Sequence, residues 1–172
     1  MEWDDKNSAL NEEAWKHISA GEYEQAEKIL RRLHERTDPG DAHRMFYLYG
    51  LLASVLNSLQ RFDKATEMIR QQLSEAKRIT TSNAAVDAAR YFLSYQFLLH
   101  GAPEQALAEA DPVPEGVGHA QCLLHSVTAQ ALWKLSRHED AVVAARHAIA
   151  AAPTEERRSE LLVELAAIFG AG

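Results

Sequence analysis

An alanine recurs four times in the same local setting, and this recurrence constrains the fold more than any other feature of the chain. The alanines are separated by 39, 41 and 35 residues. Each one ends a short stretch that joins two segments whose apolar residues are spaced as on one face of a helix. A period of this size in a helical pattern predicts a stacked array of helical hairpins. The four stretches are Gly21–Ala26, Gln60–Ala65, Gly101–Ala106 and Ser136–Ala141.

The helical pattern predicts four hairpins and one further helix within a single domain of residues 1–172. A break at Thr80–Asn83 offers an N-cap to the third hairpin. Pro103 suits the first turn of a helix, whereas the prolines in Asp111–Gly116 cannot continue one, so the third hairpin is cut short. Thr154 is the expected N-cap of the last helix, which seals the open end of the array. The hairpins are expected at about 8–36, 41–79, 84–110 and 117–151, and the capping helix at about 155–169.

Composition and charge restrict the class of partner. Hydrophobic residues make up 47% of the 172 residues and charged residues 25%, as in an average folded protein. Acidic residues number 25 against 18 basic ones, giving a net charge of −7, which disfavours nucleic acid as a partner. No run approaches the roughly 18 apolar residues that cross a bilayer, and the acidic N-terminus lacks the pattern of a secretory signal. We therefore expect a cytoplasmic protein that does not contact a membrane.

Aligned by their alanines, the four units resemble the tetratricopeptide repeat (TPR), a helix–turn–helix unit of 34 residues. Small residues at Ala53, Ser94 and Ala129 allow helices to cross closely, as do the period alanines. The resemblance covers about residues 8–153 and implies an all-α fold, a right-handed superhelical array of antiparallel hairpins with about nine helices. The second unit matches best, through Tyr49, Leu52, Ala53, Leu56, Phe62, Ala65 and Ile69.

In TPR arrays the first helix of each hairpin lines a concave face that binds peptides or proteins. Aromatic side chains on such a face bury a large area at a low entropic cost. The competing interpretation is that some of these residues belong to the core or contact the capping helix. Trp15 and Ile18 are less secure members of the set. The resemblance implies a partner-binding groove formed by Tyr47, Ser54, Asn57, Tyr91, Tyr95, Leu98, Gln130 and Trp133.

No sequence motif indicates an enzyme, a cofactor or a metal site. His119, Cys122 and His125 are spaced three apart, but the two histidines differ by about 240° around a helix and cannot share one metal ion as ligands. The chain contains no GxSxG, HExxH or phosphate-binding glycine loop. Cys122 is the single cysteine, and its apolar surroundings in the sequence predict a buried thiol.

The sequence thus favours a non-enzymatic adaptor that binds a protein or peptide in an aromatic groove. Two alternatives stay open. The same apolar surface could form a homodimer or an assembly module, as in bacterial regulators whose helical repeats resemble these. The net charge of −7 would also suit an acidic inhibitor or immunity-type protein, although no motif supports that hypothesis.

Overall fold

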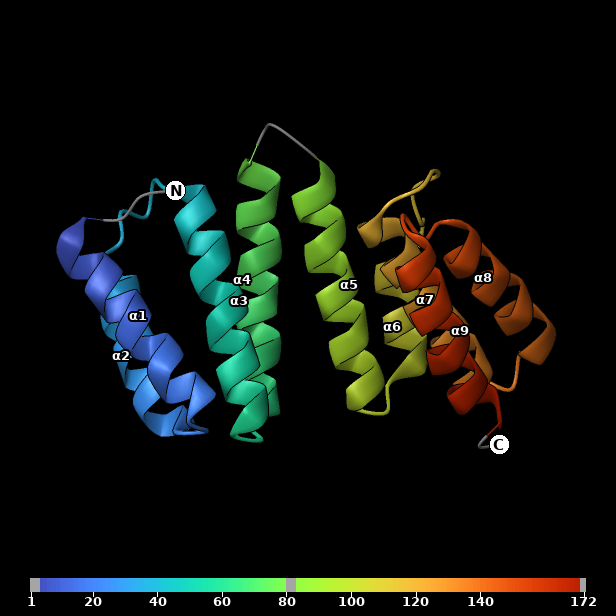
Figure 1. The fold of residues 1–172 in the computed structure, drawn as a ribbon, viewed down its shortest axis with the longest axis horizontal. Helices are drawn as coiled ribbons and strands as arrows, with labels where there is room; N and C mark the ends of the chain where they lie inside the picture. The colour runs from blue at the N-terminus through green and yellow to red at the C-terminus, as the bar shows by residue number, and fades with distance from the viewer. Residues whose placement is uncertain (1–3, 80–82, 171–172) are drawn as a thin grey trace. The chain divides into compact units, whose positions relative to one another are not determined.

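The computed structural model describes residues 4–79 and 83–170. Within these ranges the regular structure consists of nine α-helices without a strand (Figure 1), which confirms the predicted all-α fold class. The chain forms two compact units, Met1–Val86 and Asp87–Gly172, with the boundary inside one helix. Each unit is described by itself.

The first unit contains two helical hairpins. Their helices are α1 (Asp5–Ser19), α2 (Tyr23–Arg36), α3 (Ala42–Ser58) and α4 (Phe62–Arg78), and consecutive helices pack against each other. Helix α1 begins three residues earlier than the sequence pattern suggested, because the Asp4 side chain accepts a hydrogen bond from the Asn7 N–H at 2.8 Å and caps the helix. One cluster of the core, contributed by α1, α2 and α3, contains Ala14, Ala26, Ile29, Leu30, Leu33, Leu48, Leu52 and Val55.

The second unit contains most of α5 (Asn83–Leu99), then α6 (Pro103–Ala110), α7 (His119–Lys134), α8 (His138–Ala150) and α9 (Glu155–Gly170). Pro103 begins α6 as predicted. Thr154 caps α9 by accepting a hydrogen bond from the Arg157 N–H at 3.1 Å, also as predicted. Helix α7 begins at His119 and not near Val117, because the Gly118 N–H bonds to the Ala151 carbonyl. The N-cap expected within Thr80–Asn83 falls on residues 80–82, which lie outside the described residues.

The short helix α6 ends in a loop that one arginine holds in place. The guanidinium group of Arg90, on α5, donates hydrogen bonds to the carbonyls of Glu109, Ala110 and Pro112 at 2.9–3.2 Å. Carbonyls at the end of a helix have no partner within the helix. Arg90 therefore satisfies the C-terminal carbonyls of α6 and fixes the start of the loop that follows.

The period alanines are buried in the packing between helices. All four are fully buried, as are Ser94 and Ala129, and Ala53 is nearly so. A side chain no larger than a methyl group lets the second helix of each hairpin pack close to its neighbours. The alanine that recurs in the sequence therefore marks a buried helix contact that recurs in each hairpin. The four alanines are Ala26, Ala65, Ala106 and Ala141.

The four hairpin turns share one backbone conformation. The residue five positions before each period alanine has a positive φ, between 57° and 74°. Its N–H bonds to the carbonyl three residues earlier, and the next N–H bonds to the carbonyl five residues earlier, at 2.9–3.1 Å. This pattern is the Schellman motif, which ends a helix through one left-handed residue. The left-handed residues are Gly21, Gln60, Gly101 and Ser136.

Replacing the two non-glycine residues should stabilise the fold. A left-handed conformation strains any residue with a Cβ atom. We expect Gln60→Gly and Ser136→Gly each to raise the free energy of unfolding by about 0.5–1 kcal/mol. Gly21→Ala should lower it by a similar amount, since a Cβ atom there meets no neighbour within 4 Å and only backbone strain acts. Chemical denaturation of the three variants measures these changes, and a loss of stability in both glycine variants would contradict the assignment.

Enlarging a period alanine should have the opposite effect. We expect Ala65→Leu and Ala141→Leu each to lower the free energy of unfolding by about 1–3 kcal/mol, because three extra carbon atoms must enter a filled helix crossing. Ala166→Leu is a matched control on the exposed side of α9. Thermal unfolding followed by circular dichroism compares the three variants, and equal stability in all of them would mean that the crossings tolerate bulk.

Candidate functional site

The predicted groove residues lie on the first helices of hairpins in both units. In the first unit, Tyr47 of α3 is joined to α1 by a pair of hydrogen bonds. Its hydroxyl accepts from the Trp15 indole N–H at 2.8 Å and donates to the Asn11 side-chain oxygen at 3.2 Å. Trp15 is 44% exposed. The structure thus places Trp15 beside Tyr47, on a surface whose polar groups bond to one another and whose indole ring is open to solvent.

The other two predicted residues of this unit lie further along α3. Ser54 is exposed and Asn57 is half-buried. Ser54 stands seven residues after Tyr47, about two helical turns along the same side of α3. The first unit therefore presents Trp15, Tyr47 and Ser54 on neighbouring first helices.

In the second unit, two tyrosines of α5 form a stacked pair. The ring centroids of Tyr91 and Tyr95 are 5.9 Å apart and the ring planes differ by 23°. Tyr91 is half-buried, and burial raises the pKa of its hydroxyl, with smaller contributions from Tyr95 and Glu164. Tyr95 is 39% exposed. Of the two rings, Tyr95 offers the larger surface to a partner.

Two further predicted residues contribute less surface. Leu98 is only 6% exposed and belongs to the core formed by α5, α6 and α7. Gln130 of α7 is half-buried, and its amide donates to the Ser126 hydroxyl at 3.4 Å. A partner on this face would meet the edge of Gln130 and little of Leu98.

The last predicted residue, Trp133 of α7, lies beneath α9. Its ring centroid is 4.6 Å from that of Phe169 and 4.2 Å from that of His138. Trp133 and Phe169 both pack against the core shared by α7, α8 and α9. The indole is thus half-buried by the chain itself, which is the contact with the capping helix that the sequence left open.

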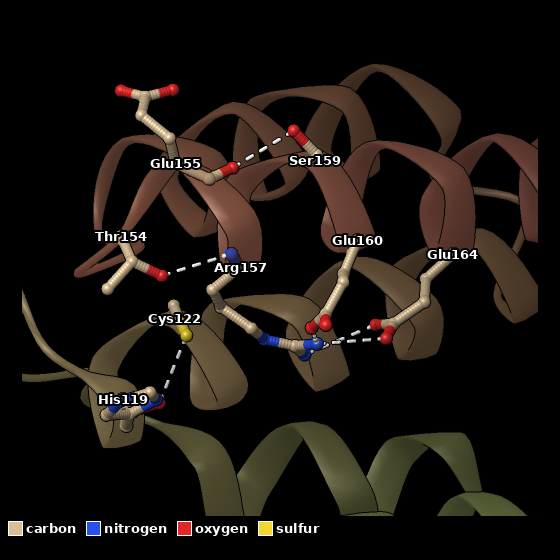
Figure 2. Close-up of polar contacts among 8 residues, drawn as sticks. All are labelled: His119, Cys122, Thr154, Glu155, Arg157, Ser159, Glu160 and Glu164. Atoms are coloured by element: carbon tan, nitrogen blue, oxygen red, sulfur yellow. Dashed lines mark hydrogen bonds and ion pairs between the residues drawn. The ribbon is translucent and has the colours of Figure 1, made fainter.

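A polar cluster lies where α9 faces α7 (Figure 2). The guanidinium group of Arg157 bonds to Glu160 at 2.8 Å and to Glu164 at 3.0 Å. Burial alone would lower the pKa of Arg157, but the hydrogen bonds to the two carboxylates outweigh it and raise that pKa. Arg157 also lies close enough to Cys122 to lower the pKa of its thiol, and this thiol donates to the His119 carbonyl at 3.1 Å. The cluster therefore covers the single thiol of the protein with a paired cation.

Sequence reasoning missed Asn11, Arg157, Glu160, Glu164 and Phe169 as members of these surfaces. The carboxylates stand three and seven residues after Arg157, a spacing that places all three side chains on one helix face and was visible in the sequence. The contacts of Asn11 and Phe169 join helices far apart in the chain. No local pattern in the sequence reveals them.

The described residues show no arrangement typical of a metal centre or a membrane span. In residues 4–79 and 83–170, no three His, Cys, Asp or Glu side chains come together as metal ligands would. No helix in the same ranges is both long enough and apolar enough to cross a lipid bilayer.

Comparison with known proteins rests on structure. No protein-family model matches the chain, and no curated protein sequence matches it. The nearly identical TPR-like repeats of a kinesin light chain-like protein from Podosopora anserina match in two crystal structures. Their TM-scores are 0.72 and 0.70 at 15% identity, over 99% of this chain and 88% and 89% of those chains. BtubC (BKLC) from P. vanneervenii matches with a TM-score of 0.70 at 18% identity, over 94% of this chain and 71% of that one.

The fold is tetratricopeptide-like. Identities this low establish the fold alone, and TPR-like folds generally mediate protein–protein interactions. The TPR-like fold accounts for the period alanines and the shared turn.

The Cys122 thiol gives a direct measurement of how tightly α9 covers α7. Burial raises the pKa of this thiol, although Arg157 acts in the opposite direction, so little reactive thiolate forms near neutral pH. We expect the native protein to react with a thiol reagent at pH 8 far more slowly than the denatured protein. Removing the Arg157 cation raises the pKa of the thiol, but it also uncovers the sulfur, and we expect the gain in access to dominate, so that Arg157→Ala accelerates the native reaction. Arg146→Ala, on the exposed side of α8, should leave the rate unchanged. Equal rates in native and denatured protein would contradict the burial.

Proposed function

We propose that this protein is a non-enzymatic adaptor that binds a protein or peptide segment on the aromatic surface of its first helices. The single observation that carries the proposal is the stacked Tyr91–Tyr95 pair, with Tyr95 exposed on a first helix of a TPR-like array. Aromatic side chains of this kind supply much of the binding energy at protein interfaces.

Two further features support this proposal. The Trp15–Tyr47–Asn11 hydrogen bonds hold a second aromatic surface in one conformation before any partner arrives. Rigid aromatic groups lose little entropy on binding, which favours affinity. The second unit contains 11 acidic and 6 basic residues, and this excess of negative charge favours partners that are not acidic.

Panning a library of random 12-residue peptides displayed on phage against the intact protein tests the proposal. Peptides that bind should lose about 2 kcal/mol of binding free energy, or about 30-fold in Kd, with Tyr95→Ala. The stability of this variant should change little because Tyr95 is partly exposed. Val143→Ala is a matched control: Val143 is an exposed apolar residue on α8, the second helix of its hairpin.

Three outcomes are informative. Binding that depends on Tyr95 and not on Val143 supports the aromatic surface. Binding that neither substitution affects would place the interface elsewhere. Unfolding of Tyr95→Ala in circular dichroism, with no separable loss of binding, would mean that Tyr95 is structural and would end the proposal.

A further inference from the structure

Four side chains of the capping helix α9, spaced four residues apart, contact the rest of its unit. Leu161 packs against Cys122, Ala151 and Ala152. Leu165 packs against the alanines of α8 and Leu132 of α7. Because four residues exceed one turn by about 40°, the row winds slowly around α9 and follows one continuous strip of the α7–α8 surface. The four side chains are Arg157, Leu161, Leu165 and Phe169.

The charged groups of α9 bond to one another. The ion pairs that α9 forms within the described chain are Arg157–Glu160, Arg157–Glu164 and Arg158–Glu155, and all of them lie within the helix itself. Such pairs stabilise a helix whether or not it is docked. Toward α7, the Arg157 guanidinium group lies close enough to the Cys122 thiol to lower the pKa of that thiol. Among the residues that the structure describes, no ion pair joins α9 to another helix, and its docked position depends mainly on apolar packing.

The strip covered by α9 overlaps the candidate functional site. The Phe169 ring lies against that of Trp133 in a tilted arrangement, and both Arg157 and Glu164 lie close enough to Tyr91 to affect the pKa of its hydroxyl. A partner helix that reached both Trp133 and Tyr91 would need the space that α9 fills. The helix α9 therefore already fills part of the proposed binding surface. Its side chains show which chemical groups that surface can bind.

We propose that α9 is a displaceable occupant of the α7–α8 surface, and that the partner replacing it is an amphipathic helix with Arg, Leu, Leu and an aromatic residue at four-residue steps. This inference rests on the proposed function and specifies its partner class. The alanine-rich surface receives leucine side chains, the Trp133 ring receives an aromatic ring, and the Cys122 thiol receives a guanidinium group. The partner helix competes with α9 for this surface, and it can bind only to the fraction of molecules in which α9 has left.

The loop before α9 makes that competition severe. Only residues 151–154 separate α8 from α9. A short tether gives a high effective concentration, on the order of millimolar or more, of the docked helix near its own site. The apparent affinity of a free partner falls by the fraction of molecules in which the surface is open. Weakening α9 should therefore strengthen the binding of a partner, the opposite of what a destabilising substitution does at an ordinary interface.

A fluorescein-labelled peptide with the sequence of residues 154–170, titrated against the intact protein in fluorescence anisotropy, tests this directly. Leu165→Ala in the protein removes a buried contact of α9 and should tighten peptide binding about tenfold or more. Leu162→Ala is the matched control, because Leu162 is 52% exposed on the outer side of the same helix. A peptide with alanine at both buried leucine positions should not bind any of these proteins.

Phe169→Ala is a second variant, near the end of α9, in case Leu165→Ala disturbs the fold. Circular dichroism and the rate of Cys122 labelling report whether α5–α8 stay folded while α9 opens. Equal peptide affinity in the Leu165→Ala, Phe169→Ala and Leu162→Ala proteins would overturn the inference. If peptides selected from the phage library still require Tyr95 in that case, the adaptor proposal stands and only the displacement of α9 is lost.

Discussion

The close approach of helices at small, buried side chains is the constraint on which the whole structure depends. A methyl group at each period position allows the second helix of a hairpin to lie against its neighbours, and larger side chains then fill the space on either side. Ser94 and Ala129 play the same part on first helices, where they are fully buried. Tyr95 follows Ser94 on α5, about 100° further around the helix, so the side next to the crossing is left to present its ring, which is 39% exposed.

The sequence predicted what depends on local chemistry. Pro103 begins α6 and Thr154 caps α9, because the preference of each residue is set by the backbone next to it. The positive φ of Gln60 and Ser136 was less accessible, since neither residue type signals it as glycine does. Within the candidate site, the sequence placed Tyr91 and Tyr95 on one helix face. The sequence could not predict that Leu98 is buried or that Phe169 covers Trp133, because both features depend on packing between helices.

The polar contacts of the second unit divide into two kinds. Arg90 of α5 donates hydrogen bonds to the carbonyls at the end of α6. These bonds link two different helices directly. The ion pairs of α9 join residues of the same helix and leave its attachment to apolar side chains. Ion pairs within one helix support that helix whether or not it is docked, so the contacts that α9 would lose on leaving are its apolar ones. The proposed exchange with a partner helix uses that difference.

The positions of the tryptophans have a consequence for how the folding of the chain can be followed. Trp133 is the one tryptophan in the second unit, whereas Trp3 and Trp15 belong to the first. Repeat proteins lose cooperativity when the coupling between neighbouring units is weak. A variant in which Phe replaces Trp133 therefore emits only from the first unit, and a variant without the other two indoles emits only from the second. Two denaturation curves from intrinsic fluorescence would coincide if the array melts as one body and separate if it melts in halves.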